Sequence, residues 1–134
     1  MQTVKKQTLA VCAGVHATQD GLTSTVYVLL PILAQSLGLR YAQVGIVRAV
    51  YSGMMWVLEI PAGILSERFG EQRLLVFGLI TAGLGYGILS TVNSFYGVLF
   101  ALLIAGTGAA FQHSLSSALI SRVCLLYTSD AADE

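Results

Sequence analysis

A short charged segment between two long apolar runs is the feature that most constrains the fold. From residue 44 to 65 the chain carries only Arg48 and Glu59 as charged residues, and from 74 to 121 it carries no acid, lysine or arginine. Between these runs, residues 63–73 hold four charged residues and two glycines. Glycine permits tight turns, and charges are more stable among headgroups than in lipid. The segment is therefore predicted to be a tight loop between two antiparallel transmembrane helices.

The composition supports a chain that lies in a bilayer. Charged residues make up 10% of the 134 residues and the mean hydropathy is +0.75, whereas soluble domains carry roughly 25% charged residues. About 20 residues cross a hydrocarbon core. Four apolar stretches reach that length, at residues 9–37, 42–65, 74–92 and 95–120. We expect an all-α membrane protein, with no soluble domain and no nucleic-acid partner.

The last eleven residues, 124–134, look foreign to the rest of the chain. They agree codon by codon with the translation of a transposase adapter used in sequencing-library preparation. We expect residues 1–123 to be native and 124–134 to be adapter, the alternative being a short polar cytoplasmic tail.

The basic residues predict an orientation. In a four-span arrangement, Arg40 falls on one side of the membrane, and five basic residues fall on the other: Lys5, Lys6, Arg68, Arg73 and Arg122. Because cytoplasmic loops carry an excess of lysine and arginine, we expect a cytoplasmic N-terminus in a bacterial inner membrane.

Polar residues in the first stretch are candidates for function, because ionisable groups inside a membrane are costly. His16, Asp20, Ser24 and Tyr27 share one helical face. A low dielectric disfavours the charged form of a carboxyl group, so Asp20 is a candidate reversible proton carrier. Its alternative role is a structural hydrogen bond to a neighbouring helix, and His16 could serve only to orient Asp20.

The second stretch places Arg48 and Glu59 on one face, about 16 Å apart along a helix. They cannot pair with each other, so each needs a partner elsewhere. Arg48 could instead snorkel to the external surface. Glu59, just before a kink expected at Pro61, could carry a proton, bind a cation or pair with another helix.

The third and fourth stretches differ in character. Glycines at 78, 83, 85 and 87 predict close helix packing rather than a nucleotide loop. In the fourth stretch, Gln112 and His113 are candidates for lining a cavity, the alternative being hydrogen bonds between helices. Outside the expected adapter segment, Cys12 is the single cysteine, and we expect it to be a packing residue. No metal-ligand spacing, nucleophile–base pair or phosphate loop is visible, so neither cofactor nor enzymatic activity is expected.

The charged loop resembles a signature of the major facilitator superfamily of transporters, found between their second and third helices. The matching residues are Gly63, Leu65, Ser66, Arg68 and Gly70. The usual aspartate is Glu67 here, and the usual pair of cations is Glu71 and Gln72, so Arg73 alone restores positive charge. In the fourth stretch, Gly106, Gly108, Ala109 and Ala110 resemble a motif of proton-coupled exporters, although the arginine of that motif is Leu102 here.

Four features of the chain resemble the fosmidomycin-resistance-like branch of this superfamily: His16 with Asp20, the Leu29-Leu30-Pro31 run, residues 37–45 and residues 108–113. The resemblance implies the first four helices of a six-helix N-terminal bundle in a twelve-helix fold, cut inside that bundle so that the C-terminal helices are missing. It implies a secondary transporter that exports a small molecule by proton-driven alternating access, with the loop acting as a latch and the fragment itself inactive. Metabolite uptake by symport, a non-transporting membrane sensor and a membrane-embedded enzyme are the alternatives.

Overall fold

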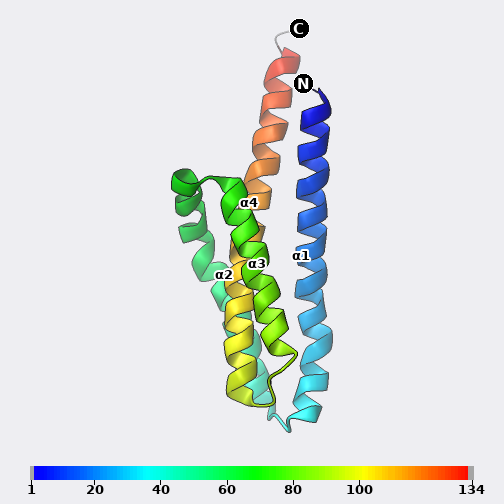
Figure 1. The fold of residues 1–134 in the computed structure, drawn as a ribbon, viewed down its shortest axis with the longest axis vertical. Coiled ribbons are helices and arrows are strands. Elements are labelled where there is room, and N and C mark those ends of the chain that lie inside the picture. Colours follow the sequence, from blue (N-terminus) through cyan, green and yellow to red (C-terminus); the bar gives the residue numbers. More distant parts are fainter. Residues whose placement is uncertain (1, 133–134) are drawn as a thin grey trace.

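The computed structural model describes the backbone of residues 2–132 and the side chains of residues 6–7, 9–119 and 121. Four helices account for nearly all of this part of the chain, and none of its residues lies in a strand. They are α1 (Gln2–Ser36), α2 (Tyr41–Phe69), α3 (Glu71–Leu89) and α4 (Phe95–Ala132). Successive helices run in opposite directions, so that the start of α1 and the end of α4 lie at the same end of the molecule (Figure 1). The expected order of four helices is confirmed.

The helix ends differ from the expected boundaries, most clearly at the charged loop. A single residue, Gly70, separates α2 from α3, and its φ of 86° is accessible to glycine at little cost. The amide of Gly70 donates to the carbonyl of Ser66 at 3.0 Å, which closes the last turn of α2. The charged residues on either side of Gly70 are therefore helical. Sequence reasoning placed them in a loop because it treated charge as a helix terminator, whereas only the glycine breaks the helix.

At the other end of the chain, α4 continues to Ala132, beyond the expected end at residue 120. The helical backbone thus runs through most of the segment expected to be adapter. The side chains of that segment, together with Lys5 and Arg122, lie outside the described residues.

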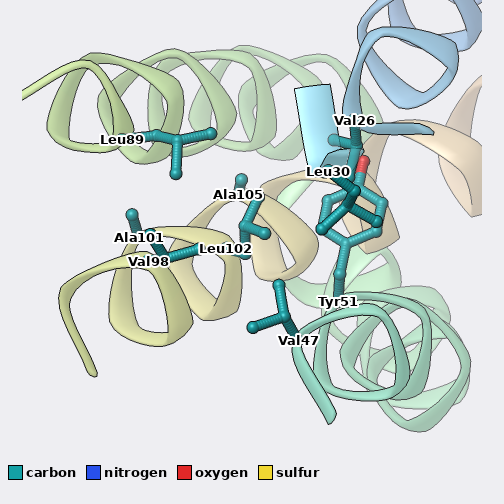
Figure 2. Close-up of a cluster of buried hydrophobic side chains, with 9 residues drawn as sticks. All are labelled: Val26, Leu30, Val47, Tyr51, Leu89, Val98, Ala101, Leu102 and Ala105. Carbon is teal, nitrogen blue, oxygen red and sulfur yellow. The ribbon is translucent and has the colours of Figure 1, made fainter. Parts of the chain in front are cut away.

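The centre of the bundle is α4, which packs against each of the other three helices. Its pairing with α3 and with α2 is extensive, whereas its contact with α1 is smaller. The contact between α1 and α2 is smaller still. The main hydrophobic cluster lies where all four helices meet, toward the α1–α2 turn (Figure 2). It contains Val26 and Leu30 of α1, Val47 and Tyr51 of α2, Leu89 of α3, and Val98, Ala101, Leu102 and Ala105 of α4.

Small residues set the spacing of α3 and α4. A Cβ atom added at Gly85 would collide with the backbone of Ala105, and one added at Gly108 with the backbone of Ala82. Gly78 likewise faces the carbonyl of Gly108. Such positions allow helix backbones to approach closely, which is how membrane helices pack. The structural role predicted for the α3 glycines is confirmed at 78 and 85, whereas Gly83 and Gly87 face open space.

Within the described part of the chain, three helices are long and apolar enough to cross a membrane: Tyr41–Phe69, Glu71–Leu89 and the Phe95–Leu119 part of α4. α1, with 35 residues, is long enough but less apolar, because polar residues such as Gln19, Asp20 and Thr23 occupy its middle. Large apolar side chains cover the outer surface of α2, where Trp56, Val57 and Ile60 are exposed. Such a surface is stable against lipid or another helix rather than against water.

Candidate functional site

The clearest gathering of ionisable groups joins α1 to α4. His16 and Asp20, one turn apart on α1, place Nε2 and Oδ2 3.5 Å from each other. The imidazole of His16 stacks on that of His113 from α4, with ring centroids 5.5 Å apart and planes inclined by 24°. The other ring nitrogen of His16, Nδ1, lies 3.2 Å from the hydroxyl of Ser116, also on α4. We call His16, Asp20 and His113 the histidine–aspartate cluster.

The hydrogen bonds around Ser116 favour a proton on Nδ1 of His16. The Ser116 hydroxyl donates to the carbonyl of His113 at 3.4 Å. A hydroxyl has one proton to donate, so in this arrangement Nδ1–H of His16 donates to Ser116 Oγ. The Nε2 atom of the neutral ring then presents a lone pair toward Asp20.

The setting of Asp20 bears on the alternatives left open by the sequence. Its side chain is 60% exposed, and the contact recorded for it is with His16 of the same helix. Ser24 and Tyr27, further along the same face, are exposed as well. The hydrogen bond between α1 and α4 is made by His16 rather than by Asp20. Asp20 thus contacts its own helix, whereas His16 joins α1 to α4.

Arg48 and Glu59 of α2 lie in different surroundings, as their separation along the helix predicted. The guanidinium of Arg48 lies 4.8 Å from the centre of the Tyr27 ring of α1, a cation–π contact. Arg48 and Tyr27 line a cavity of about 760 Å³ near the α1–α2 turn, and Arg40 borders the same cavity. Glu59 borders a separate cavity of about 240 Å³ together with Trp56 and His113. Glu59 therefore lies near the histidine–aspartate cluster, and Arg48 does not.

Gln112 and His113, both candidates for lining a cavity, face different neighbours and border different cavities. Gln112 is 1% exposed, and its amide nitrogen donates to the carbonyl of Leu75 on α3 at 2.8 Å. Its Oε1 has no hydrogen-bond partner among the described residues. Gln112 borders a largely apolar cavity of about 350 Å³ between α1, α3 and α4. Successive residues on a helix point about 100° apart, so Gln112 faces α3 while His113 faces α1 and α2.

Sequence reasoning missed a partly buried chain of polar groups that links three helices. Tyr86 of α3 donates to the carbonyl of Leu22 on α1 at 3.0 Å, so its oxygen is free to accept from Tyr51 of α2 at 3.1 Å. Tyr51 in turn accepts from Thr23 at 3.2 Å, and Thr23 accepts from the amide of Gln19 at 3.3 Å. Each hydroxyl thus donates once and accepts once. The i, i+4 spacing of Gln19 and Thr23 was the available signal.

The charged loop presents several of its charged side chains at the surface. Glu67, Arg68 and Arg73 are exposed, and Leu65 is partly so. Arg68 lies in the last turn of α2, where the helix dipole favours a cation. Gly63 has open space around it, and Gly70 makes the turn. Glu67, Arg68 and Arg73 are therefore accessible at the surface of the described residues.

Three of the candidate residues could together hold a metal ion. His16, Asp20 and His113 each offer one ligand atom, and these atoms lie within 4.8 Å of one another. The sequence predicted no metal site, because the third ligand comes from a helix nearly one hundred residues away.

Comparison with known proteins identifies a family. The family model of the Major Facilitator Superfamily matches residues 9–124. An uncharacterized transporter of Buchnera aphidicola subsp. Schizaphis graminum is 36% identical over 78 residues, which are 58% of this chain and 19% of that protein. The match begins within α1 and so includes the helix that is less apolar than the other three.

Two further relatives have names that state an activity. The bacillibactin exporter of Bacillus subtilis is 33% identical over 58% of this chain and 19% of its own length. The fosmidomycin resistance protein of Escherichia coli is 24% identical over 76% of this chain and 25% of its own length. The chain thus spans about a fifth to a quarter of the relatives that it matches. No solved structure matches it significantly.

Proposed function

Because the chain belongs to the Major Facilitator Superfamily, we propose that it is part of a secondary transporter that exports a small molecule by proton-driven alternating access. In this mechanism two helical bundles rock about a central site that opens to one side of the membrane at a time. The relatives named as an exporter and a resistance protein support the direction of transport. The observation that carries proton coupling is the contact between His16 and Asp20.

We further propose that residues 1–123 are the first four helices of the N-terminal bundle of a twelve-helix protein and that residues 124–134 are adapter-derived. A chain that spans about a fifth of its relatives agrees with this division. Four helices do not enclose a pathway between two bundles, so the fragment alone is expected to be inactive in transport.

The proposed proton pathway runs over the histidine–aspartate cluster. His16 bridges α1 to α4 and faces Asp20, so a proton can pass between the imidazole and the carboxylate without a large movement of either side chain. Glu59, which borders a cavity with His113, extends the set of proton-accepting groups to α2. Gln112 and Arg48 border other cavities. We propose that these two residues contact the substrate.

Glu67 and the loop around it are proposed to act as a latch between the two halves. Glu67 is exposed near the C-terminal end of α2. A carboxylate is stabilised at the N-terminus of a helix, where the dipole is positive. Such a helix in the opposite bundle would hold one access state, and loss of the contact would favour the other. We also propose an inner-membrane location with the N-terminus in the cytoplasm, on the side of the α2–α3 turn.

The decisive experiment is Asp20→Asn in the complete protein. Everted vesicles energised with a proton gradient would be assayed for accumulation of fosmidomycin and bacillibactin, the compounds named in two relatives. We expect the variant to lose gradient-driven accumulation while it keeps gradient-independent exchange, because asparagine binds no proton in the carrier's place. Ser24→Ala, one turn away on the same exposed face, should keep both activities.

Full gradient-driven transport by Asp20→Asn would exclude Asp20 as the proton carrier. If accumulation instead occurs only in right-side-out vesicles, the protein is an uptake system, and the proposed direction is wrong.

A further inference from the structure

We propose that His16, Asp20 and His113 form a binding site for one divalent transition-metal cation such as Zn²⁺. The three residues supply two imidazole nitrogens and one carboxylate oxygen, from helices α1 and α4. Imidazole is a preferred ligand of zinc, nickel and copper, whereas magnesium and calcium prefer oxygen. The proposal concerns binding alone, so it stands independently of the proposed transport activity.

The spacing of the ligand atoms suits a tetrahedral ion. Bonds of about 2.0–2.1 Å at tetrahedral angles place ligand atoms roughly 3.3 Å apart. His16 Nε2 and Asp20 Oδ2 are already 3.5 Å apart. All three ligand atoms lie within 4.8 Å of one another, and Asp20 and His113 are exposed. Rotation of these two side chains can therefore close the site without displacing a helix.

Ser116 prepares His16 for this role. A metal-binding histidine typically donates its second ring N–H to a protein group, which sets the tautomer and the ring orientation. Here Nδ1–H donates to Ser116 Oγ, so that the lone pair of Nε2 is directed toward Asp20. Ser116 is buried and held by the carbonyl of His113, so the orienting group and the third ligand belong to one turn of α4.

The charge and the space around the cluster also agree with a cation. Asp20 supplies one negative charge, and no lysine or arginine is recorded in contact with the three ligands among the described side chains. The cavity that His113 borders with Glu59 leaves room beside the cluster for water or a further ligand as the fourth group. Sites with three protein ligands commonly keep such an open position.

The test uses Co²⁺ as a spectroscopic substitute for Zn²⁺, with the 134-residue chain in lipid nanodiscs. The affinity tag is removed, and both cysteines are replaced by serine so that no thiolate competes. The chain contains two histidines, both in the cluster, so imidazole coordination has no other source. We expect a saturable Co²⁺ absorption spectrum at one ion per chain, abolished by Zn²⁺ and unaffected by excess Mg²⁺.

Variants separate this site from incidental binding. His16→Gln, His113→Gln and Asp20→Asn should each weaken Co²⁺ affinity at least about tenfold, because loss even of an outer-shell partner costs 10–100-fold. Asp20→Glu keeps the carboxylate and should retain binding. Glu67→Gln, the charge-matched control, removes an exposed carboxylate in the last turn of α2 and should change the affinity by less than about twofold.

Circular dichroism would verify that every variant keeps the helical content of the parent chain. The proposal is overturned if no saturable spectrum appears, or if the three ligand variants bind Co²⁺ as tightly as the parent. A loss of affinity in Glu67→Gln equal to that in Asp20→Asn would also overturn it, because binding would then follow net charge rather than the cluster.

Discussion

At the scale of single residues, the packing of the helices depends on a few polar side chains whose hydrogen bonds have defined donors and acceptors. Tyr51 and Tyr86 lie among apolar side chains, yet each hydroxyl both donates and accepts. A buried hydroxyl without a partner costs free energy, so the two residues are suited to the interior only as a pair. Because the chain of hydrogen bonds ends on the carbonyl of Leu22, it also fixes α1 relative to α2 and α3.

We predict that Tyr86→Phe destabilises the bundle. The variant keeps the ring but removes the acceptor for Tyr51, which leaves a buried donor without its partner. Hydrogen bonds between membrane helices contribute about 0.6 kcal/mol on average and up to about 1.7 kcal/mol, and a loss in this range is expected. Unfolding in mixed micelles with increasing denaturing detergent, followed by circular dichroism, measures it.

Tyr96→Phe is the matched control, because this tyrosine is 78% exposed and lies at the start of α4. Equal stability of Tyr86→Phe and the parent chain would show that the network carries no net free energy.

At the scale of helices, some glycines of α3 lie against the backbone of α4, and others face open space. Gly85 meets the backbone of Ala105 directly, whereas Gly83, two residues earlier, has open space around it. The sequence shows both simply as glycines in an apolar run. Which of them are needed depends on the face of α3 that is turned toward α4, and that is a property of the packed pair.

We predict that Gly85→Ala and Gly83→Ala have opposite effects. A methyl group at Gly85 forces the helices apart, and overpacking of this kind typically costs about 1–3 kcal/mol. At Gly83 the methyl group meets no atom, and alanine is better than glycine in a helix by up to about 1 kcal/mol. The same denaturing-detergent titration compares the two variants with the parent chain. Similar stabilities for both variants would contradict the close approach at Gly85.

At the scale of the whole molecule, the exposed surface is the main feature. α2 and α3 present many large apolar side chains outward, and the polar face of α1 is uncovered as well. Lipid can cover the apolar surface, but a polar face is stable only against a cavity or other helices. This contrast supports the proposal that further helices accompany α1 in the complete protein.

We predict that the source DNA, amplified outward from the codon of Val123, encodes other residues after Val123 than those at positions 124–134. Residues 124–134 should be replaced, and further apolar segments of about 20 residues should follow. Sequencing of the amplified product measures this directly. A frame that ends at Glu134 in the source DNA would make the chain a four-helix protein and would remove the basis for a two-bundle mechanism.

Much of the architecture follows from the order of residues alone. Long apolar runs, each long enough for a bilayer and separated by turn residues, determine four antiparallel helices and a turn within residues 63–73, since an unpaired backbone is costly in lipid. The spacing of His16 and Asp20 likewise places both on one face of α1. These are local properties, set by helix geometry and by the solvent around the chain.

Only the tertiary structure decided which of these residues meet. The rotation of α4 about its axis turns His113 toward His16 and Gln112 toward Leu75, and the approach of α2 and α3 to α1 joins Tyr51 and Tyr86 to Thr23 and Leu22. Such contacts depend on how small residues allow helix backbones to pack. That packing is a sum over many distant residues, and no single segment of the sequence contains it.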